Sequence, residues 1–357
     1  MKNSARVSDH IRNAGVSFRP HVKTLKSVEA ARYYAPAGSA ITVSTLAEAY
    51  AFAEAGYTDI LYAVTLTPNK LDAVFSLLRQ GVHLIVIIDS HAALNALRDN
   101  LISGGPTLSV AVELDCDGAR AGIAANDPAL IELASAIDST DGLTFHGLVT
   151  HAGASYGCFT EQERTSMASQ EQSALLTAAE RLERAGLTCR MRSLGSTPTA
   201  LTDIDRQGIT EIRAGVFATF DCVMANLGVC DINDIALSVL TRVIKVDAAS
   251  QRIIVDAGWM ALSRDTGTRG QWRDCGYGLV CDEYGNVLDG WRVTQANQEH
   301  GIIEYAGDKT DTVSRFRFDQ LLRILPVHAC ATAAQHTHYH LTEGDKIVEQ
   351  WTSIGGW

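Results

Sequence analysis

The sequence lacks long hydrophobic runs, and it lacks an excess of positive charge. Its longest wholly aliphatic run, Leu84–Ile88, is far too short to cross a bilayer. Lys and Arg number 30 against 41 Asp and Glu, so the formal net charge is −11. A surface this acidic is unsuited to nucleic acid or to an anionic membrane. We therefore expect neither kind of partner.

Paired cysteine motifs, an apolar leader and glycine-rich nucleotide motifs are missing as well. The eight cysteines include no C-x-x-C pair, and a chain of 357 residues does not need disulfides to hold a core. Residues 1–17 are polar and mixed, without the apolar core of a secretion signal. No P-loop or G-x-G-x-x-G occurs. These features predict a reduced, cytoplasmic protein whose cysteines are mostly structural.

Eight short apolar runs alternate with longer segments of helical spacing over the first two-thirds of the chain. Several runs are apolar almost throughout, which is typical of strands buried on both faces of a parallel sheet. Helices such as Leu46–Ala55 and Glu161–Ala185 are followed by a glycine that can end them. The predicted strands are Ser17–Val22, Ala40–Ser44, Asp59–Val64, His83–Asp89, Leu108–Asp115, Leu143–His151, Arg190–Gly195 and Glu211–Phe217. Eight strand–helix units close a (β/α)8 TIM-type barrel.

An open, doubly wound sheet gives a similar pattern and is the alternative fold. The barrel is favoured because polar residues lie at or just after the C-terminal ends of successive strands, where barrel enzymes build their active sites. These residues are Lys23, Ser44, Asp89, Asp115, His151, Ser196 and Asp221. After about residue 230, short apolar runs separated by turns replace the helical spacing. We expect an α/β barrel over residues 1–230, followed by a C-terminal β-rich domain over residues 231–357.

Two of the strand ends suit a phosphorylated aldehyde. Lys23 ends the first strand, where a desolvated amine can form a Schiff base, although a lysine that reaches out to solvent is the more common arrangement. The segment Gly195–Thr199 offers backbone N–H groups and hydroxyls to a phosphate, and an ordinary turn is the alternative. Arg213–Gly215 adds a small residue at the next strand. Together these segments suggest pyridoxal phosphate.

A second candidate centre is the pair His328 and Cys330. In a strand, residues i and i+2 point to the same face, so the two side chains would converge. They supply half of a tetrahedral Zn²⁺ shell and leave positions for water and substrate. A buried cysteine beside a hydrogen-bonded histidine is the alternative. Likewise, His151 and Arg120 could contact a cofactor ring, or they could be a core histidine and a surface ion pair.

These motifs, taken in order, resemble one known family. They are Arg19–Thr24, His151–Gly153, Gly195–Thr197, Arg213–Gly215, Glu299–Gly301 and Pro326–Thr332. The set resembles the D-serine dehydratase / D-threonine aldolase family of fold-type III pyridoxal-phosphate enzymes, whose barrel is like that of alanine racemase. The resemblance runs from about Phe18 to the C-terminus. Thr42–Leu46 and Val255–Met260 read like the bacterial D-threo-3-hydroxyaspartate dehydratase branch of that family.

The resemblance implies a role for each candidate residue. Lys23 would form the Schiff base with pyridoxal 5'-phosphate and move the Cα proton. His328 and Cys330 would bind Zn²⁺ or another divalent metal. The other implied cofactor-binding residues are Ser196 and Thr197 at the phosphate, Arg120 near the pyridine nitrogen and His151 against the ring, together with His21, Tyr62, Gly195 and Gly215. The family also implies a homodimer.

The implied reaction removes water and then ammonia from a D-3-hydroxy amino acid, such as D-threo-3-hydroxyaspartate or D-serine, and leaves a 2-oxo acid. An aldolase that cleaves the Cα–Cβ bond of the same substrates is the alternative. Cys330 favours the dehydratase, because aldolase relatives tend to have a carboxylate there. A racemase needs no metal pair, and a non-catalytic pyridoxal-phosphate-binding protein is a third alternative. The sequence does not choose among the D-3-hydroxy amino acids.

Two departures from the family pattern stand out. Phe217 replaces a tyrosine that lies by the phosphate in the family, and Tyr62 is a candidate to supply the missing hydroxyl. Family members also begin with a further β-strand ahead of the position of Met1, and that strand belongs to the β domain. We therefore expect the β domain to lack this strand.

Overall fold

The computed structural model describes residues 2–307 and 311–357. The chain divides into two compact units, Met1–Phe217 with Ile354–Trp357 and Ala218–Ser353. The domain boundary expected after residue 230 falls inside the second unit and stays a prediction. Each unit is described by itself below.

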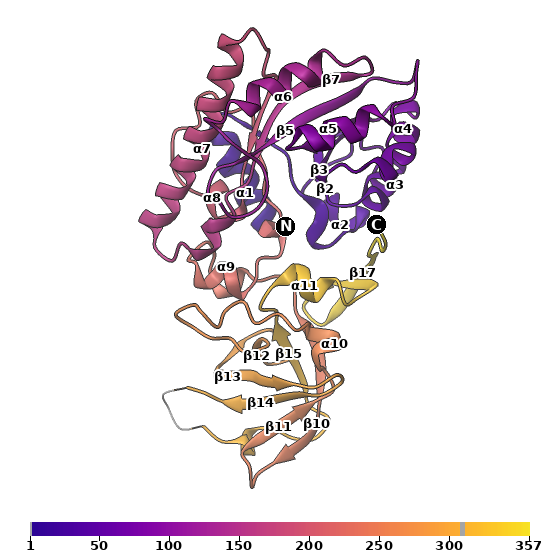
Figure 1. Ribbon diagram of the computed structural model, residues 1–357. Helices are drawn as coiled ribbons and strands as arrows, with labels where there is room; N and C mark the ends of the chain where they lie inside the picture. Colours follow the sequence, from indigo (N-terminus) through magenta and orange to yellow (C-terminus); the bar gives the residue numbers. More distant parts are fainter. Residues whose placement is uncertain (1, 308–310) are drawn as a thin grey trace. The chain divides into compact units, whose positions relative to one another are not determined.

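The first unit is a parallel sheet with helices on its outside (Figure 1). The strands that run around it are β1 (Ser17–Phe18), β2 (Ile41–Val43), β3 (Asp59–Thr65), β4 (His83–Ile88), β5 (Leu108–Asp115), β7 (Leu143–Thr150), β8 (Met191–Leu194) and β9 (Glu211–Ile212). They follow chain order, β9 pairs with β1, and a parallel bridge between His21 and Thr42 joins the two ends. The short β6 (Ile123–Ala124) pairs with β5.

This topology confirms the predicted TIM-type barrel. A doubly wound sheet reverses its strand order part-way, and this sheet does not, so that alternative is wrong. The aliphatic run Leu84–Ile88 fills β4 and is at most 2% exposed, because side chains on one face enter the barrel and those on the other meet helices. The predicted continuous apolar strands are therefore buried on both faces.

The helices of the first unit have clear start and stop signals. The principal ones are α3 (Leu46–Glu54), α4 (Leu71–Arg79), α5 (His91–Arg98), α6 (Ala129–Asp138) and α7 (Glu161–Arg184). Thr45, Ser90 and Thr160 cap α3, α5 and α7 by accepting a backbone N–H. The long α7 starts with a Thr160/Glu163 capping box and is followed by Gly186, whose φ is +83°.

The first and last barrel strands are shorter than predicted. Strand structure ends at Phe18, and Val22–Thr24, which contains Lys23, is a 3₁₀ turn. Sheet-like hydrogen bonds continue from Arg19 N–H to the Ile212 carbonyl and from His21 N–H to the Ala214 carbonyl. Pro20, between them, has no N–H to donate, which weakens the ladder at this point.

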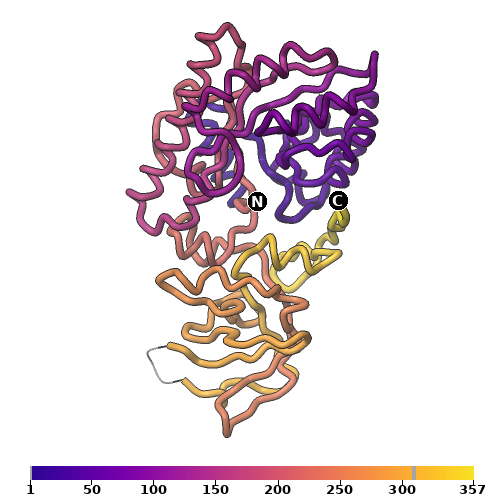
Figure 2. Tube along the Cα trace, viewed as in Figure 1, coloured from indigo at the N-terminus to yellow at the C-terminus, as the bar shows by residue number. Residues whose placement is uncertain are grey.

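The two ends of the chain lie in the first unit. Helix α1 (Lys2–Asn13) packs beside β1, with Val7 and Ile11 fully buried. The last four residues return to the N-terminal third of the chain, as the yellow end of the trace in Figure 2 shows. Ile354 N–H donates to the Lys26 carbonyl at 2.6 Å, and Lys26 Nζ lies 5.5 Å from the Trp357 ring centroid. Short helices α2 (Val28–Ala31) and α8 (Thr197–Ala200) complete this unit.

The second unit is built on a closed antiparallel barrel. Its strands are β10 (Val239–Asp247), β11 (Arg252–Val255), β12 (Leu279–Cys281), β13 (Val287–Ala296), β14 (Gly301–Tyr305) and β15 (Leu321–Leu325). They close in the order β10-β11-β14-β13-β12-β15 around an apolar core that includes Val243, Trp291 and Ile324. The same unit contains the hairpin β16 (His338–Glu343) and β17 (Lys346–Thr352) and the short helices α9 (Cys222–Asn226), α10 (Trp259–Leu262) and α11 (Ala329–Ala333). The expected C-terminal β-rich domain is confirmed.

The cysteines and the hydropathy agree with the sequence analysis. Each of the eight cysteines is a free thiol; seven are buried, and Cys330 is partly exposed. Within residues 2–307 and 311–357, no helix combines the length and apolarity that a membrane crossing requires.

Candidate functional site

A cluster of candidate residues surrounds Lys23 in the first unit. Gly215 lies beside it: a Cβ at this position would be 3.5 Å from Lys23 Cε and 3.7 Å from His21 Cβ. Burial, followed by the charges of Lys23 and Arg213, holds the pKa of His21 well below its ordinary value. The nearby His151 also contributes to the low pKa of His21. The structure thus brings together residues from three separate strand ends.

His21 offers a test of whether this cluster fits a cofactor. Its Nδ1 atom is buried and has no hydrogen-bond partner among the described residues. A buried polar atom of this kind usually belongs with a bound group or a water. The surrounding groups are a primary amine, a neutral imidazole and a glycine backbone, which together suit an aldehyde on a polar aromatic ring. The residues around Lys23 therefore fit pyridoxal phosphate.

His151 follows β7 and is held in one orientation. Its Nδ1 atom lies 3.0 Å from the Gly195 carbonyl oxygen, and because a carbonyl only accepts, Nδ1 carries the hydrogen. Burial lowers the pKa of His151 to about 3, despite the opposing effect of this hydrogen bond. The imidazole is therefore neutral near pH 7, with its Nε2 lone pair unprotonated.

The loop after β8 is shaped by its own side chains. A Cβ at Gly195 would lie 2.1 Å from the Arg213 carbonyl oxygen, and its φ is +133°, so only glycine fits. Ser196 is 2% exposed, and its hydroxyl bonds with Ser155 Oγ at 2.7 Å and with Thr199 Oγ1 at 3.0 Å. The Thr197 hydroxyl accepts from Gly215 N–H at 3.3 Å. Both hydroxyls are already hydrogen-bonded within the protein, and their role at a phosphate stays a prediction.

Glu171 is a buried residue of this region that the sequence analysis did not select. It lies on α7, is fully buried and accepts from Ala152 N–H at 2.9 Å, Gly195 N–H at 3.1 Å and Thr199 Oγ1 at 2.7 Å. It thereby ties the loop after β7 to the loop after β8. Burial raises the pKa of Glu171. A single acidic residue on a mostly polar helix carries no sequence signal, since only the fold shows that it points inward.

Arg120, Tyr62 and Phe217 have distinct surroundings. Arg120 is exposed in the loop after β5, and its charge contributes to the low pKa of His151. The Tyr62 hydroxyl accepts a hydrogen bond from Lys70 Nζ at 2.6 Å. Phe217 is fully buried and contacts Phe18 edge-on, with ring centroids 5.1 Å apart. These contacts give no support to the prediction that the Tyr62 hydroxyl replaces the tyrosine hydroxyl that the family has at the position of Phe217.

The pair His328 and Cys330 lies in the second unit, and the expectation of a strand there is wrong. His328 is the N-cap of α11, and Cys330 lies in the first turn of that helix. The preceding apolar run Leu321–Leu325 is the strand β15, which ends just before Pro326. The two side chains nevertheless meet, because a hydrogen bond joins them.

Two aspartates hold this segment. Asp265 Oδ2 lies 3.0 Å from His328 Nδ1, and Asp221 Oδ2 accepts from Ala329 N–H at 2.9 Å. The hydrogen bond with Asp265, and then that with Cys330, raises the pKa of His328 to about 10. Asp221 was noted in the sequence only as a strand-end residue, and Asp265 was not noted at all.

The donor set of this pair fits a metal ion with open coordination positions. Imidazole nitrogen and thiolate sulfur are common zinc ligands. Within residues 2–307 and 311–357, no group of three or more His, Cys, Asp or Glu side chains is arranged to hold a metal ion, and this includes the surroundings of His328. The pair would supply two ligands, and its role at a metal stays a prediction.

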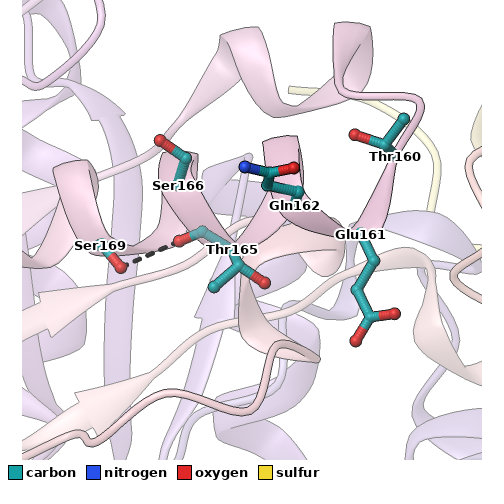
Figure 3. Close-up of a pocket in the computed structure, with 6 residues that line it drawn as sticks. All are labelled: Thr160, Glu161, Gln162, Thr165, Ser166 and Ser169. Atoms are coloured by element: carbon teal, nitrogen blue, oxygen red, sulfur yellow. Dashed lines mark hydrogen bonds between the residues drawn. The ribbon is translucent and has the colours of Figure 1, made fainter.

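A shallow depression on α7 lies apart from the predicted residues. Polar side chains from the start of this helix line it, with a hydrogen bond from Ser169 Oγ to the Thr165 carbonyl (Figure 3). Its lining residues are Thr160, Glu161, Gln162, Thr165, Ser166 and Ser169. None of them belongs to either candidate centre.

Comparisons with known proteins decide the family. Residues 1–222 match the family model for the alanine racemase N-terminal domain, and residues 236–342 match that for a putative serine dehydratase domain. Over 359 aligned residues the chain is 46% identical to the D-threo-3-hydroxyaspartate dehydratase of Delftia sp. (strain HT23), covering 100% of this chain and 94% of the relative. The chain belongs to the D-serine dehydratase / D-threonine aldolase family.

Further relatives of this dehydratase family agree. The D-serine dehydratase of Dictyostelium discoideum is 28% identical, with 97% of this chain and 91% of that protein covered. The solved structure of the Delftia enzyme matches with a TM-score of 0.95 at 45% identity, covering 100% of this chain and 95% of that one. A solved cysteine-to-alanine variant of D-threo-3-hydroxyaspartate dehydratase, in a metal-free form, matches with the same TM-score, identity and coverage. The resemblance found in the motifs is confirmed, and the chain is a member of a pyridoxal-phosphate-dependent lyase class.

Proposed function

We propose that this family member is a pyridoxal-phosphate- and zinc-dependent dehydratase. It converts a D-3-hydroxy amino acid, D-threo-3-hydroxyaspartate or D-serine, to a 2-oxo acid and ammonia. The observation that carries the proposal is the hydrogen-bonded pair of His328 and Cys330 in a chain that also has the Lys23 cluster. The pair matters because a metal ion held there would assist removal of the β-hydroxyl as a Lewis acid, whereas racemization breaks no C–O bond.

Lys23 is the residue that binds the cofactor and moves the proton. Bound pyridoxal phosphate supplies an electron sink for negative charge at Cα. Lys23 Nζ would hold the cofactor aldehyde and, as a free amine, would take the Cα proton of the substrate. Gly215 leaves room for the Lys23 chain, since no side chain stands beside Lys23 Cε at that position. His151, neutral at a pKa of about 3, would add no charge beside the bound cofactor.

His328 and Cys330 are the proposed ligands of the divalent metal. A zinc ion there supplies the Lewis acid that stabilises the departing hydroxide, a contribution of several kcal/mol. The imidazole and the thiolate would hold it and would leave positions for water and the substrate hydroxyl. The relative D-threo-3-hydroxyaspartate dehydratase has been solved as a cysteine-to-alanine variant in a metal-free form, which supports a metal role for a cysteine in this family. We further propose a homodimer, which the family resemblance implies. We also propose a reducing, cytoplasmic setting, which the eight free thiols support.

A product assay tests this function. The protein, supplied with pyridoxal phosphate and Zn²⁺, is given D-threo-3-hydroxyaspartate and D-serine in separate reactions, with L-serine as the stereochemical control. We expect 2-oxo acid and ammonia from a D-substrate only, and loss of turnover on chelation of the metal. Glycine as the main product would show an aldolase instead. Bound cofactor without turnover of either D-substrate would favour the non-catalytic protein.

A further inference from the structure

Asp265 reaches the His328 ring from a distant part of the chain and makes a direct side-chain contact with it. Its Oδ2 atom lies 3.0 Å from His328 Nδ1. The side chains are 30% and 39% exposed, respectively, so solutes can reach the pair. Asp265 is 63 residues away along the chain, and nothing in its sequence surroundings marks it.

The Asp265 carboxylate is itself held in place. Its second oxygen, Oδ1, accepts from Gly267 N–H at 2.7 Å, and its own N–H donates to Ser263 Oγ at 3.3 Å. These bonds leave Oδ2 for His328. The carboxylate therefore acts as a fixed acceptor rather than a mobile surface group.

The loop that carries Asp265 is also attached to the helix that carries Cys330. Thr332 Oγ1 donates to the Leu262 carbonyl at 2.8 Å, and His336 Nε2 bonds with the Ala261 carbonyl at 3.0 Å. Asp221 holds the Ala329 N–H on the other side. The backbone of the ligand segment and the loop of Asp265 thus form one hydrogen-bonded assembly within the second unit.

The chemistry of the contact determines which histidine nitrogen is available to a metal. An ionised carboxylate only accepts, so His328 Nδ1 carries the hydrogen of this bond. Nε2 is then the nitrogen left to coordinate, and a ring rotation that exchanged the two nitrogens would break the bond. We propose that Asp265 is a positioning residue that holds His328 by Nδ1 and so presents Nε2, together with Cys330 Sγ, to the metal.

This inference rests on the proposed metal site and adds a residue to it. Asp265 is not assigned as a third ligand, because both of its oxygens already accept hydrogen bonds. Carboxylates in this position orient the imidazole and raise its basicity, and their loss typically weakens metal binding about 10- to 100-fold.

A zinc competition experiment on the pyridoxal-phosphate-loaded protein tests the assignment. The variants are Asp265→Asn, which keeps the shape but removes the charge, and Asp265→Ala, which removes the acceptor. The matched control is Asp282→Asn, since Asp282 also accepts hydrogen bonds from a loop of the second unit, at Tyr284 and Asn286. We expect zinc affinity to fall about 10- to 100-fold in Asp265→Ala, to fall less in Asp265→Asn and to be unchanged in Asp282→Asn.

Cys330→Ala separates this inference from the proposed function. If Cys330→Ala binds zinc as tightly as the parent protein, the metal site itself is wrong. If Cys330→Ala loses zinc while both Asp265 variants keep the parent affinity, only the role of Asp265 is overturned. Co²⁺ in place of zinc gives a second readout, because its thiolate absorption band should persist in Asp265→Asn at saturating metal, showing that the Cys330 ligand and the fold are intact.

Discussion

The two candidate centres are assembled in opposite ways. Around Lys23 the residues come from distant points of the chain, including His151 after β7 and Gly195 after β8. The second centre is local, since only one residue separates His328, the N-cap of α11, from Cys330 in its first turn. The first centre therefore depends on the registration of many strands, and the second depends on one helix turn and the aspartates that hold it.

The interiors of the two units also differ in the charge that they bury. The first unit buries charges: Arg19 Nε bonds with Glu211 at 2.9 Å, and Arg213 donates to the Thr150 carbonyl at 2.6 Å. The core of the second barrel, around Trp291, is apolar. Buried charges must be paired to be tolerated, so they make the first unit sensitive to small displacements. The second unit can keep its metal pair at its surface without disturbing its core.

Substituting one key residue in one centre at a time should give the largest effects on turnover. Lys23→Ala should lower turnover on the order of 10⁴-fold and abolish the visible absorption band of bound cofactor after dialysis, while zinc binding stays unchanged. Lys26→Ala is the neighbouring control. Persistence of the band in Lys23→Ala would refute the Schiff-base assignment.

A substitution in the second centre completes this test. Cys330→Ala should keep the cofactor band and lose 2-oxo acid formation about 10²- to 10³-fold, matching several kcal/mol of Lewis-acid stabilisation. Cys230→Ala, a buried thiol in the same unit, is the control. Unchanged turnover in Cys330→Ala would show that the second centre takes no part in the reaction.

A glycine substitution should have the next largest effect. Gly195→Ala places a Cβ 2.1 Å from the Arg213 carbonyl oxygen at a φ of +133°, and we expect a loss of about 3 kcal/mol in the free energy of unfolding. Gly186→Ala shares the positive φ but meets nothing within 4 Å, so about 1 kcal/mol is expected there. Urea unfolding measures both, and equal losses would mean that the close contact is unimportant.

The smallest effect concerns His146 on β7. Burial, and then the nearby His83, lowers the pKa of His146 to about 4. As the pH falls below about 6.5, His146 binds a proton in the unfolded chain but not in the folded protein. The free energy of unfolding therefore decreases as the pH falls from about 6.5 to about 4, and this loss is complete below that pH. His146→Gln should flatten the decline in the free energy of unfolding over this interval. The same slope in parent and variant would assign the decline to other groups.

Much of the fold and of the first centre could be predicted from local patterns. Runs such as Leu84–Ile88 predict buried parallel strands, and the barrel rule places Lys23 and His151 at one end of the sheet. Two kinds of feature escaped prediction. The strand expected around Lys23 breaks at Pro20, and the segment of His328 is a helix start, because backbone hydrogen bonding there depends on neighbours that the local pattern does not contain.

The amino-acid sequence was enough to predict the fold class and the family correctly, because motif order and hydrophobic period are local properties of the chain. Only the tertiary structure shows that Glu171 joins two loops and that Asp265 accepts a hydrogen bond from His328 Nδ1. Such partners are single polar residues at long sequence separation. Their effect comes from burial and from which donor lies within about 3 Å, and both are set by packing.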